Sequence, residues 1–447
     1  MSFLFFLSSK KEKMKRPCLI IAPGKEKAIL RRHPWIFSGA VKRIEGEPQE
    51  GDLVDVVDAH GQWMATGHYQ NESIICKVLS FDTPDINEDF FRARFRSAIS
   101  YRANLGFFNY LKQSSNQAIK QSTNVFRLVH AEGDYLPGLV ADWYNGVLVL
   151  QAHSVGMHRM FPMFVDILKD ELQPYGLQSI FDKSSATVPS LQGGVARSAG
   201  VGEDGYLYGP EPLEHEITES GNRLLINFFE GQKTGFFVDQ RENRKLVQDL
   251  ARGHRVLNCF GYTGGFSLAA LRGGAEYVET VDISKKAIDL CNRNVELNFG
   301  PDAPHQGTVA DVLSVFSGKC SVLSKATQDC VSQLNTKHST LNTQFDFIIL
   351  DPPAFAKNHR SLQQGLKGYR AINQRAMEAL PAGGLLMTFS CSQAVSKEDF
   401  QTMVFTSAMN AHRRVRIVRQ LPHAMDHPVS IHHPEGEYLK GLLLQVE

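Results

Sequence analysis

The chain has 447 residues, which is too long for one ordinary domain and predicts two or three. A hydrophobic content of 43% and a charged content of 21% are typical of a globular protein with a substantial core. No apolar stretch approaches the roughly 20 residues that a bilayer span needs, so we expect no membrane partner.

The net charge of +1 conceals a strongly basic segment near the start. Residues 10–43 hold eleven Lys or Arg and only two Glu, so this segment carries +9 and the rest of the chain −8. A basic arm on an acidic body favours a polyanion partner, although a solvated charged surface explains the same pattern. The candidate phosphate contacts are Arg31, Arg32, Lys42 and Arg43.

The cysteines and the opening residues bear on the compartment. Seven cysteines, at 18, 76, 259, 291, 320, 330 and 391, form no CxxC pair and no ligand spacing. An odd, scattered set in a large chain predicts reduced thiols in a cytoplasm and no metal site. The apolar opening MSFLFFLSS lacks a basic leader and a cleavage site, so we expect no signal peptide, and Met14 is a more typical start.

The first part of the chain has the pattern of a small β-barrel. Strands are predicted for LVDVV, MATGHY and IICKVLS, which turn residues such as Gly51-Asp52 separate. We assign this barrel to residues 16–86. The next part, 87–228, predicts an α+β domain, because a helix capped by Asn87 precedes the strand-like FRLVHAEG, GLVADWY and VLVLQAH. One helix is expected over 158–176.

From about Phe229 strands and helices alternate, which predicts an α/β domain of Rossmann-like type over 229–447. The expected sheet is mostly parallel and seven-stranded. Its last two strands, VRIVRQL and LKGLLLQVE, have hairpin-like spacing. A stretch rich in Ser, Thr, Gln and Asn at 317–344 predicts an exposed insertion.

Polar residues follow four consecutive strands of this domain. In such sheets ligands bind outside the carboxyl ends of the strands. The first strand ends in NCFGYTGG, which has glycines for a tight turn but is no GxGxxG, so a dinucleotide is disfavoured. Asp282 is placed for ribose hydroxyls and Asp311 for an adenine amino group, and Asp351 ends the fourth strand. Each acid alone is most often structural, but together they predict an S-adenosylmethionine pocket.

The segment GQKTGFFVDQRENR at 231–244 leads into a helix capped near Asp239, a usual place for contacts with the methionine end. A helix start with a salt-bridged face explains the same residues. The predicted cofactor contacts are Gln240, Asn258, Phe260, Tyr262, Thr263, Gly264, Asp282, Asp311 and Asp351.

Two features point to the methyl acceptor. Asp351-Pro352-Pro353 forms a rigid turn that can face a planar base, and Phe355 either stacks on a flipped base or packs under the loop. Cys391 ends the strand next to that of Asp351. Cytosine C5 needs a thiolate on C6 before it can take a sulfonium methyl, and a strand-end Cys beside the methyl donor meets that need. An inert core Cys is the alternative, and the neighbouring acids favour the nucleophile.

Six segments together resemble the large-subunit rRNA cytosine-C5 methyltransferases of the RlmI type, over nearly the whole chain. They are HPWIFSGAV, GQKTGFFVDQRENR, NCFGYTGGFSLAALRGGA, VDISKKAIDLCNRNVELN, LDPPAFAK, and FSCS followed by HPEGEYLKGLLL. The resemblance implies an N-terminal PUA domain that docks RNA, a central α+β domain and a class I methyltransferase. It also implies that Cys391 is the nucleophile, with Asp351 a candidate for the N3/N4 edge of the cytosine. It does not give the residue that completes elimination.

The sequence therefore predicts methyl transfer from S-adenosylmethionine to C5 of a cytosine in 23S rRNA, through a covalent Cys–C6 adduct. The expected partner is 23S rRNA or a precursor of the large ribosomal subunit, and a homodimer stays open. Two alternatives also stay open: an rRNA purine or exocyclic-amino methyltransferase that uses the DPPAF loop, and a non-catalytic RNA-binding ribosome assembly factor.

Overall fold

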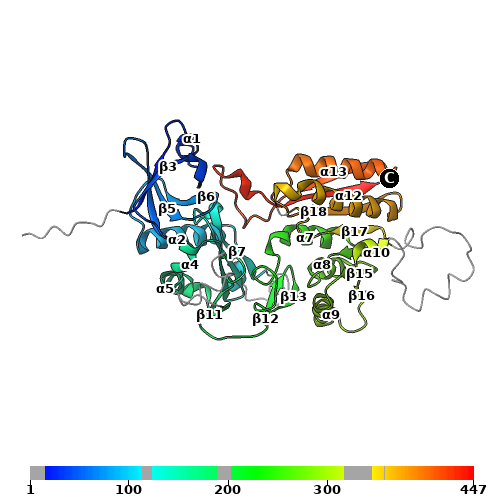
Figure 1. The fold of residues 1–447 in the computed structure, drawn as a ribbon. Coiled ribbons are helices and arrows are strands. Elements are labelled where there is room, and N and C mark those ends of the chain that lie inside the picture. Colours follow the sequence, from blue (N-terminus) through cyan, green and yellow to red (C-terminus); the bar gives the residue numbers. More distant parts are fainter. Residues whose placement is uncertain (1–15, 113–122, 189–202, 317–344, 357) are drawn as a thin grey trace, which may run out of the picture.

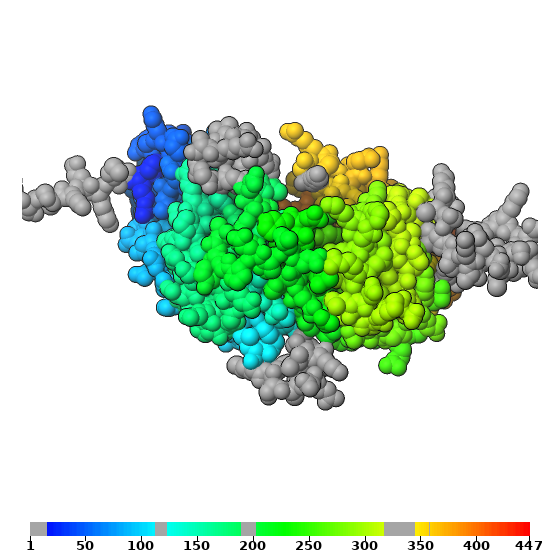
Figure 2. Space-filling model, turned by 90° about the horizontal axis from the view of Figure 1, so that it is seen from below, coloured from blue at the N-terminus to red at the C-terminus, as the bar shows by residue number. Residues whose placement is uncertain are grey.

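The structure, a computed structural model, describes residues 16–112, 123–188, 203–316, 345–356 and 358–447. Three parts follow one another along the chain and lie side by side (Figure 1, Figure 2). The expected insertion at 317–344 and the basic residues of 10–15 lie outside the described residues. Among the helices that are described, none is both long and apolar enough to cross a membrane.

The N-terminal part is a six-stranded sheet with the order β2-β6-β5-β4-β1-β3. β1 runs parallel to β4, and the other neighbours are antiparallel. Alternate side chains such as Val54 and Val56 are buried on one face, with Leu19 and Ile36, because successive side chains of a strand point to opposite faces. The elements are β1 Cys18–Ile21, α1 Lys27–Leu30, β2 Trp35–Phe37, η1 Ser38–Ala40, β3 Val41–Glu45, β4 Leu53–Val57, β5 Trp63–Tyr69 and β6 Ile74–Ser80.

The central part is a five-stranded sheet, β11-β10-β9-β8-β7, covered by helices. The side chain of Asn87 accepts a hydrogen bond from the Phe90 amide at 3.0 Å, so the predicted helix cap is confirmed. The helix expected over 158–176 is confirmed for Phe161–Leu172, but the segment is divided: another helix ends at Arg159, and Pro162 lies in the first turn of the next one. The elements are α2 Glu88–Asn104, η2 Asn109–Lys112, β7 Val125–His130, η3 Ala131–Asp134, β8 Leu139–Tyr144, β9 Val147–Ala152, α4 Val155–Arg159, α5 Phe161–Leu172, η4 Gln173–Tyr175, β10 Ser179–Asp182 and β11 Gly205–Tyr208.

A two-stranded hairpin joins the central part to the C-terminal part. It consists of β12 (His215–Glu219) and β13 (Asn222–Ile226), and its buried side chains pack in one core with Tyr144 of the central part and Phe266 of the C-terminal part. The predicted boundary at residue 228 is therefore crossed by a continuous apolar core, which fixes the two parts to each other.

The C-terminal part has the predicted seven-stranded, mostly parallel sheet, in the order β16-β15-β14-β17-β18-β20-β19. Only β20 runs antiparallel to its neighbours. Two cores lie on its faces, one with α7, α8 and α9 and one with α10, α12 and α13 (Figure 1). The elements are η6 Val238–Gln240, α7 Arg241–Leu250, β14 Arg255–Cys259, α8 Gly265–Gly273, β15 Tyr277–Asp282, α9 Lys285–Phe299, β16 His305–Val309, α10 Val312–Phe316, β17 Phe347–Leu350, η7 His359–Ser361, α12 Leu362–Ala379, β18 Gly384–Ser390, α13 Lys397–Asn410, β19 Val415–Leu421, η8 Pro434–Gly436 and β20 Lys440–Val446.

The connection between β19 and β20, residues 422–439, is not a simple hairpin loop. It leaves the sheet and reaches the other two parts, as the red segment of Figure 1 shows. Asp426 anchors it: both carboxylate oxygens accept hydrogen bonds from Arg241 at 2.8 Å, and one also accepts from the Arg127 amide at 2.7 Å. Arg102 donates to the Asp426 carbonyl at 2.7 Å. Since these groups are buried, the connection is held in one place between the three parts.

Candidate active site

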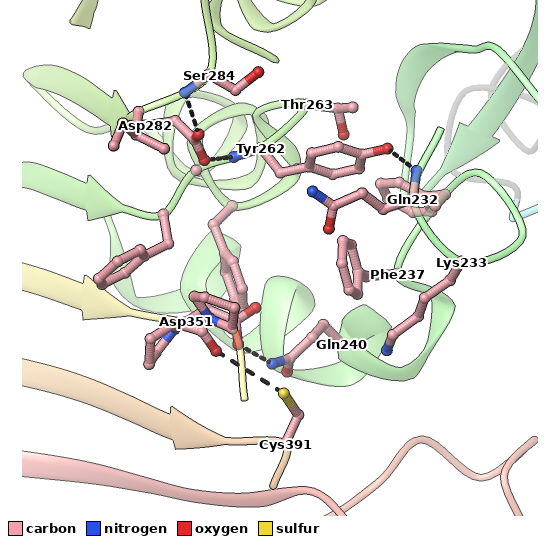
Figure 3. A pocket seen from close by; sticks show the side chains of 18 of the residues that line it. Gln232, Lys233, Phe237, Gln240, Tyr262, Thr263, Asp282, Ser284, Asp351 and Cys391 are labelled. Carbon is pink, nitrogen blue, oxygen red and sulfur yellow. Dashed lines mark hydrogen bonds between the residues drawn. The ribbon is translucent and has the colours of Figure 1, made fainter. Parts of the chain in front are cut away.

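A small cavity of about 290 Å³ opens at the carboxyl ends of β14, β15, β17 and β18 (Figure 3). Most residues of the predicted cofactor set line it: Gln240, Phe260, Tyr262, Thr263, Asp282, Asp311 and Asp351. The edge of a parallel sheet has brought together residues that lie more than 100 positions apart in the chain.

The turn between β14 and α8 is tightly packed and strained. Phe260 and Tyr262 have φ values of 61° and 45°, in the left-handed region that favours glycine. A Cβ on Gly261 would lie 2.1 Å from Thr280, and one on Gly264 would lie 2.4 Å from the Cys291 sulfur. The turn therefore requires glycine at both positions, and two bulky residues hold a conformation that is typical of ligand sites.

Asn258 and Gly264 do not line the cavity. The Asn258 side chain is fully buried and donates to the Ser267 hydroxyl at 2.8 Å, beneath the turn. These two residues shape the turn, whereas the sequence had placed them among the direct contacts.

Asp282 fixes the turn and still faces the cavity. One carboxylate oxygen accepts from the Tyr262 amide at 3.1 Å and the other from the Ser284 amide at 2.8 Å (Figure 3). Each oxygen keeps a lone pair for a further donor, as ribose hydroxyls would supply. Asp311 lies two residues after β16, not at its last residue, and accepts from the Ser314 amide at 3.0 Å.

The opposite end of the cavity is formed by the segment before α7. Tyr262 accepts a hydrogen bond from the Gln232 amide at 2.8 Å, and its ring meets Phe237 edge-on at 5.3 Å. The Lys233 ammonium lies 4.5 Å from the centre of the Phe237 ring. Figure 3 shows these side chains gathered around the space between Tyr262 and Asp351.

Two carboxyl groups near this end have opposite pKa shifts. Burial and the negative charge of Asp239 raise the pKa of Asp351 to about 7, and Gln240 donates to Asp351 at 2.9 Å. Burial alone would raise the pKa of Asp239 too, but Lys233 at 3.2 Å and the Tyr438 hydroxyl at 2.6 Å hold it below its usual range. Near neutral pH Asp239 is therefore ionised, whereas Asp351 is protonated in part of the molecules.

Cys391 follows β18 and lies next to the Asp351-Pro352-Pro353 turn. Its half-buried thiol points to the Pro352 carbonyl, with the sulfur 3.9 Å from the oxygen (Figure 3). Burial raises the pKa of Cys391, and the charge of Lys233 opposes that rise. Lys440 supports the loop after Cys391, because its ammonium donates to the Ser392 carbonyl at 2.6 Å.

A second, larger cavity of about 960 Å³ meets the first one at Gln232, Lys233 and Cys391. All three parts of the chain contribute to its wall: Trp35 and Lys77 from the N-terminal part, Arg127, His153 and Lys183 from the central part, and Gln393, His433 and Tyr438 from the C-terminal part. Its walls thus combine cationic side chains with aromatic rings, and Cys391 lies where the two cavities join.

Comparisons with known proteins agree with this architecture. A family model for a PUA-like domain matches residues 19–81, and a model for an S-adenosylmethionine-dependent methyltransferase matches residues 126–428. The "Ribosomal RNA large subunit methyltransferase I" of Erwinia tasmaniensis is 38% identical over 432 residues, which cover 96% of this chain and 99% of that protein. The chain belongs to this methyltransferase family. Its relative of the same name from Escherichia coli is 37% identical with the same coverage.

Solved structures share the fold of this methyltransferase. A candidate SAM-dependent methyltransferase from Streptococcus mutans has a TM-score of 0.74 at 21% identity, over 96% of this chain and 99% of that one. A candidate methyltransferase solved in complex with SAH has the same values.

As the family description states, the cofactor is S-adenosylmethionine. The small cavity fits it: Asp282 offers acceptors for ribose hydroxyls, the Gly261 turn allows close backbone approach, and polar groups surround the opposite end.

The predicted RNA contacts lie apart from both cavities. Arg32 is paired with Asp82 at 2.6 Å and Arg43 with Glu45 at 2.7 Å, while Arg31 and Lys42 are exposed. Phe355 lines neither cavity. Its ring centre lies 4.7 Å from that of Tyr369. The sequence left open whether Phe355 stacks on a base or packs under the loop, and in the structure it packs.

The wall of the large cavity was missed by the sequence reasoning. Trp35 lay in the quoted HPWIFSGAV segment but had no assigned role, and Lys77 and Lys183 gave no signal, since each is one lysine in an ordinary strand pattern.

Proposed function

We propose that this methyltransferase modifies C5 of a cytosine in large-subunit rRNA through a covalent bond between Cys391 and C6. The observation that carries the proposal is the position of the Cys391 sulfur, at the junction of the cofactor cavity and the larger cavity. A base in the larger cavity would lie between the thiol and the bound methyl donor. The names of the curated relatives support rRNA of the large subunit as the substrate.

The chemistry begins with proton transfers that the site can support. The Cys391 thiol gives its proton to solvent, and the positive charge of Lys233 stabilises the thiolate. The thiolate adds to C6 of the cytosine, and the electron pair that leaves the C5–C6 bond is stabilised when protonated Asp351 donates its proton to N3. With a pKa of about 7, Asp351 still holds that proton in a substantial fraction of molecules at neutral pH.

The adduct then has a nucleophilic C5. Bound S-adenosylmethionine would supply the methyl group to C5: its sulfonium–methyl bond would break and S-adenosylhomocysteine would be left. A base next removes the C5 proton, the C5–C6 double bond re-forms, and the thiolate of Cys391 leaves. Asp351 recovers the N3 proton, the Cys391 thiolate takes a proton back from solvent, and the base releases the C5 proton to solvent, so the enzyme returns to its starting state.

Two alternatives have less support. A purine or exocyclic-amino methyltransferase of the DPPAF type would use Phe355 to stack the base, but this ring packs against Tyr369 instead. A non-catalytic assembly factor would not need Asp282, Asp311 and Asp351 to line one cavity with a thiol at its mouth.

The compartment and the oligomeric state of the protein are also part of the proposal. Five cysteines lie among the described residues and none of them forms a disulfide, which favours a reducing compartment such as the cytoplasm. A homodimer stays a prediction.

Nucleoside mass spectrometry tests the proposal. Large-subunit rRNA transcribed in vitro is incubated with the enzyme and methyl-labelled S-adenosylmethionine, and the RNA is then digested. We expect the label in 5-methylcytidine. Label in a methylated purine or in N4-methylcytidine would contradict the proposal and favour the first alternative, and no label in any RNA would favour the second.

A further inference from the structure

Three side chains of metal-binding type meet where the N-terminal part touches the β19–β20 connection. His33 precedes β2, His433 directly precedes η8, and Glu435 lies in η8. One ligand atom of each lies within 4.8 Å of the other two. Two imidazoles and one carboxylate form a ligand set that suits Zn²⁺ and neighbouring divalent transition metals.

Two of the three ligand spacings are close to those of a tetrahedral centre, and all three ligand atoms lie within 4.8 Å of one another. The Nε2 atom of His33 lies 3.4 Å from the Glu435 carboxylate, and the Nδ1 atom of His433 lies 3.1 Å from it. Bonds of about 2.0–2.1 Å to a tetrahedral ion put its ligand atoms about 3.4 Å apart. The three groups can therefore share an ion with small side-chain adjustments.

The second ring nitrogen of His33 is already oriented. Its Nδ1 atom lies 3.2 Å from the carbonyl oxygen of Trp35 and can donate a hydrogen to it, which leaves the Nε2 lone pair free for an ion. Metal-bound histidines are usually held in this way by a carbonyl or a carboxylate. Without an ion, the other tautomer is available, because Nδ1 can instead accept from the Trp35 amide.

The ring of His433 is buried and has a nitrogen without a hydrogen-bond partner among the described residues. It is 3% exposed and packs against the Trp35 ring, with the ring centres 4.3 Å apart. Its Nδ1 atom is near Glu435 but forms no hydrogen bond of proper geometry with any described residue.

We propose that His33, His433 and Glu435 bind one divalent transition-metal ion of the zinc class, with water in the fourth position. The ion would join the N-terminal part to the connection that closes the large cavity, since Trp35 and His433 both line that cavity. It would act as a structural clamp at the cavity rim. The proposal does not depend on which base is methylated.

The test uses the full-length, untagged protein with Cys391→Ser, so that the active-site thiol cannot bind the metal. Co²⁺ is added as a spectroscopic probe and Zn²⁺ binding is measured by calorimetry. We expect one equivalent of each, and no thiolate-to-cobalt charge-transfer band. His33→Gln, His433→Gln and Glu435→Gln should each weaken binding by about tenfold or more.

His432→Gln is the matched control, because His432 is an exposed neighbour outside the cluster. It should bind the metal like the parent protein, and Zn²⁺ should raise the Tm of both but not that of Glu435→Gln. Glu435 is exposed, so this variant is expected to fold even if the histidine variants do not. No equivalent of bound metal, or binding that Glu435→Gln leaves unchanged, would overturn the proposal.

Discussion

The two cavities that meet at Cys391 differ in how the chain builds them. The smaller one is formed by strand ends and turns of the C-terminal part alone, and its polar residues stand in recognisable motifs. The larger one takes its wall from all three parts and from the β19–β20 connection. A cofactor site of this kind can be found from a contiguous stretch of sequence, whereas the site for the methyl acceptor exists only once the domains are packed together.

The comparison also separates two kinds of function. Substitutions in the smaller cavity should weaken S-adenosylmethionine binding and leave the affinity for RNA unchanged. Substitutions in the larger cavity should weaken RNA binding and leave the affinity for S-adenosylmethionine unchanged. Cys391 lies where the cavities join and is proposed to bond to C6 during the reaction, so its substitution should leave both affinities nearly unchanged and abolish methyl transfer.

The largest effect is expected for Cys391→Ala. Methyl transfer should fall by at least about 10⁴-fold, because Cys391 is the only thiol among the described residues that line the two cavities. S-adenosylmethionine affinity, measured by calorimetry, should change less than about twofold, since the thiol does not hold the cofactor. Cys18→Ala removes a thiol of the N-terminal sheet and is the control that should keep activity. Normal turnover by Cys391→Ala would exclude the covalent mechanism.

Asp282→Asn should have the next largest effect and tests the smaller cavity. The amide keeps one acceptor but loses the negative charge that ribose hydroxyls and the two backbone amides share. We expect S-adenosylmethionine binding to weaken by about 10–100-fold, the range for hydrogen bonds to charged groups. RNA affinity in a filter-binding assay should stay unchanged. A parallel loss of RNA binding would break the separation between the two cavities.

Lys77→Met tests the larger cavity. Its ammonium donates to the His153 carbonyl at 3.1 Å and lies on the cavity wall. We expect the KM for RNA to rise by about 3–10-fold, with a salt dependence reduced by about one charge. Arg32→Met is the control, because Arg32 is already paired with Asp82. If the control has the larger effect, RNA docks on the outer face of the N-terminal part and not in the cavity.

Asp351→Asn tests the end of the smaller cavity that lies next to Cys391, and the expected effect is smaller and depends on pH. The pKa of this carboxyl is about 7 in the folded protein and about 4 in an unfolded chain. The folded state therefore binds the extra proton between these values, and the wild-type protein loses stability as the pH rises from about 4 to about 7. The variant lacks this loss, so at pH 8 its Tm should exceed that of the wild type by several degrees, and the difference should shrink toward pH 5.

The measurement is differential scanning calorimetry without cofactor, from pH 5 to pH 8. Gln240 can still donate to the amide oxygen that the substitution introduces, so the contact that holds this side chain is preserved. Equal Tm differences at all pH values would mean that the folded and unfolded pKa values of Asp351 are the same.

The sequence predicted the sheet and the smaller cavity well for a physical reason. Parallel strands must end at one edge, so Asp282 and Asp351 could be placed together from their positions after two strands. The direction in which a loop side chain points could not be predicted in the same way. Phe355 and Asn258 lay in the right motifs, yet one packs on Tyr369 and the other lies beneath the turn. Local sequence does not tell which face of a loop a side chain will occupy.

The larger cavity could not be predicted because its residues share no motif. Trp35, Lys183 and His433 are separated by 148 and 250 positions in the chain, and they share one cavity only because the three parts and the β19–β20 connection pack together. The sequence indicated the hairpin-like pairing of β19 with β20, which the structure has, but not the course of the chain between them. Its course is set by the buried pairing of Asp426 with Arg241, which look like two ordinary charged residues in the sequence.

Trapping the covalent intermediate tests the central claim most directly. RNA that carries 5-fluorocytidine at the target position has no C5 proton to lose, so the adduct cannot break down after methyl transfer. With S-adenosylmethionine present, we predict a stable protein–RNA complex in which peptide mass spectrometry finds the nucleotide on Cys391. No complex with the active enzyme, or a complex that still forms with Cys391→Ala, would contradict the assignment of Cys391 as the nucleophile.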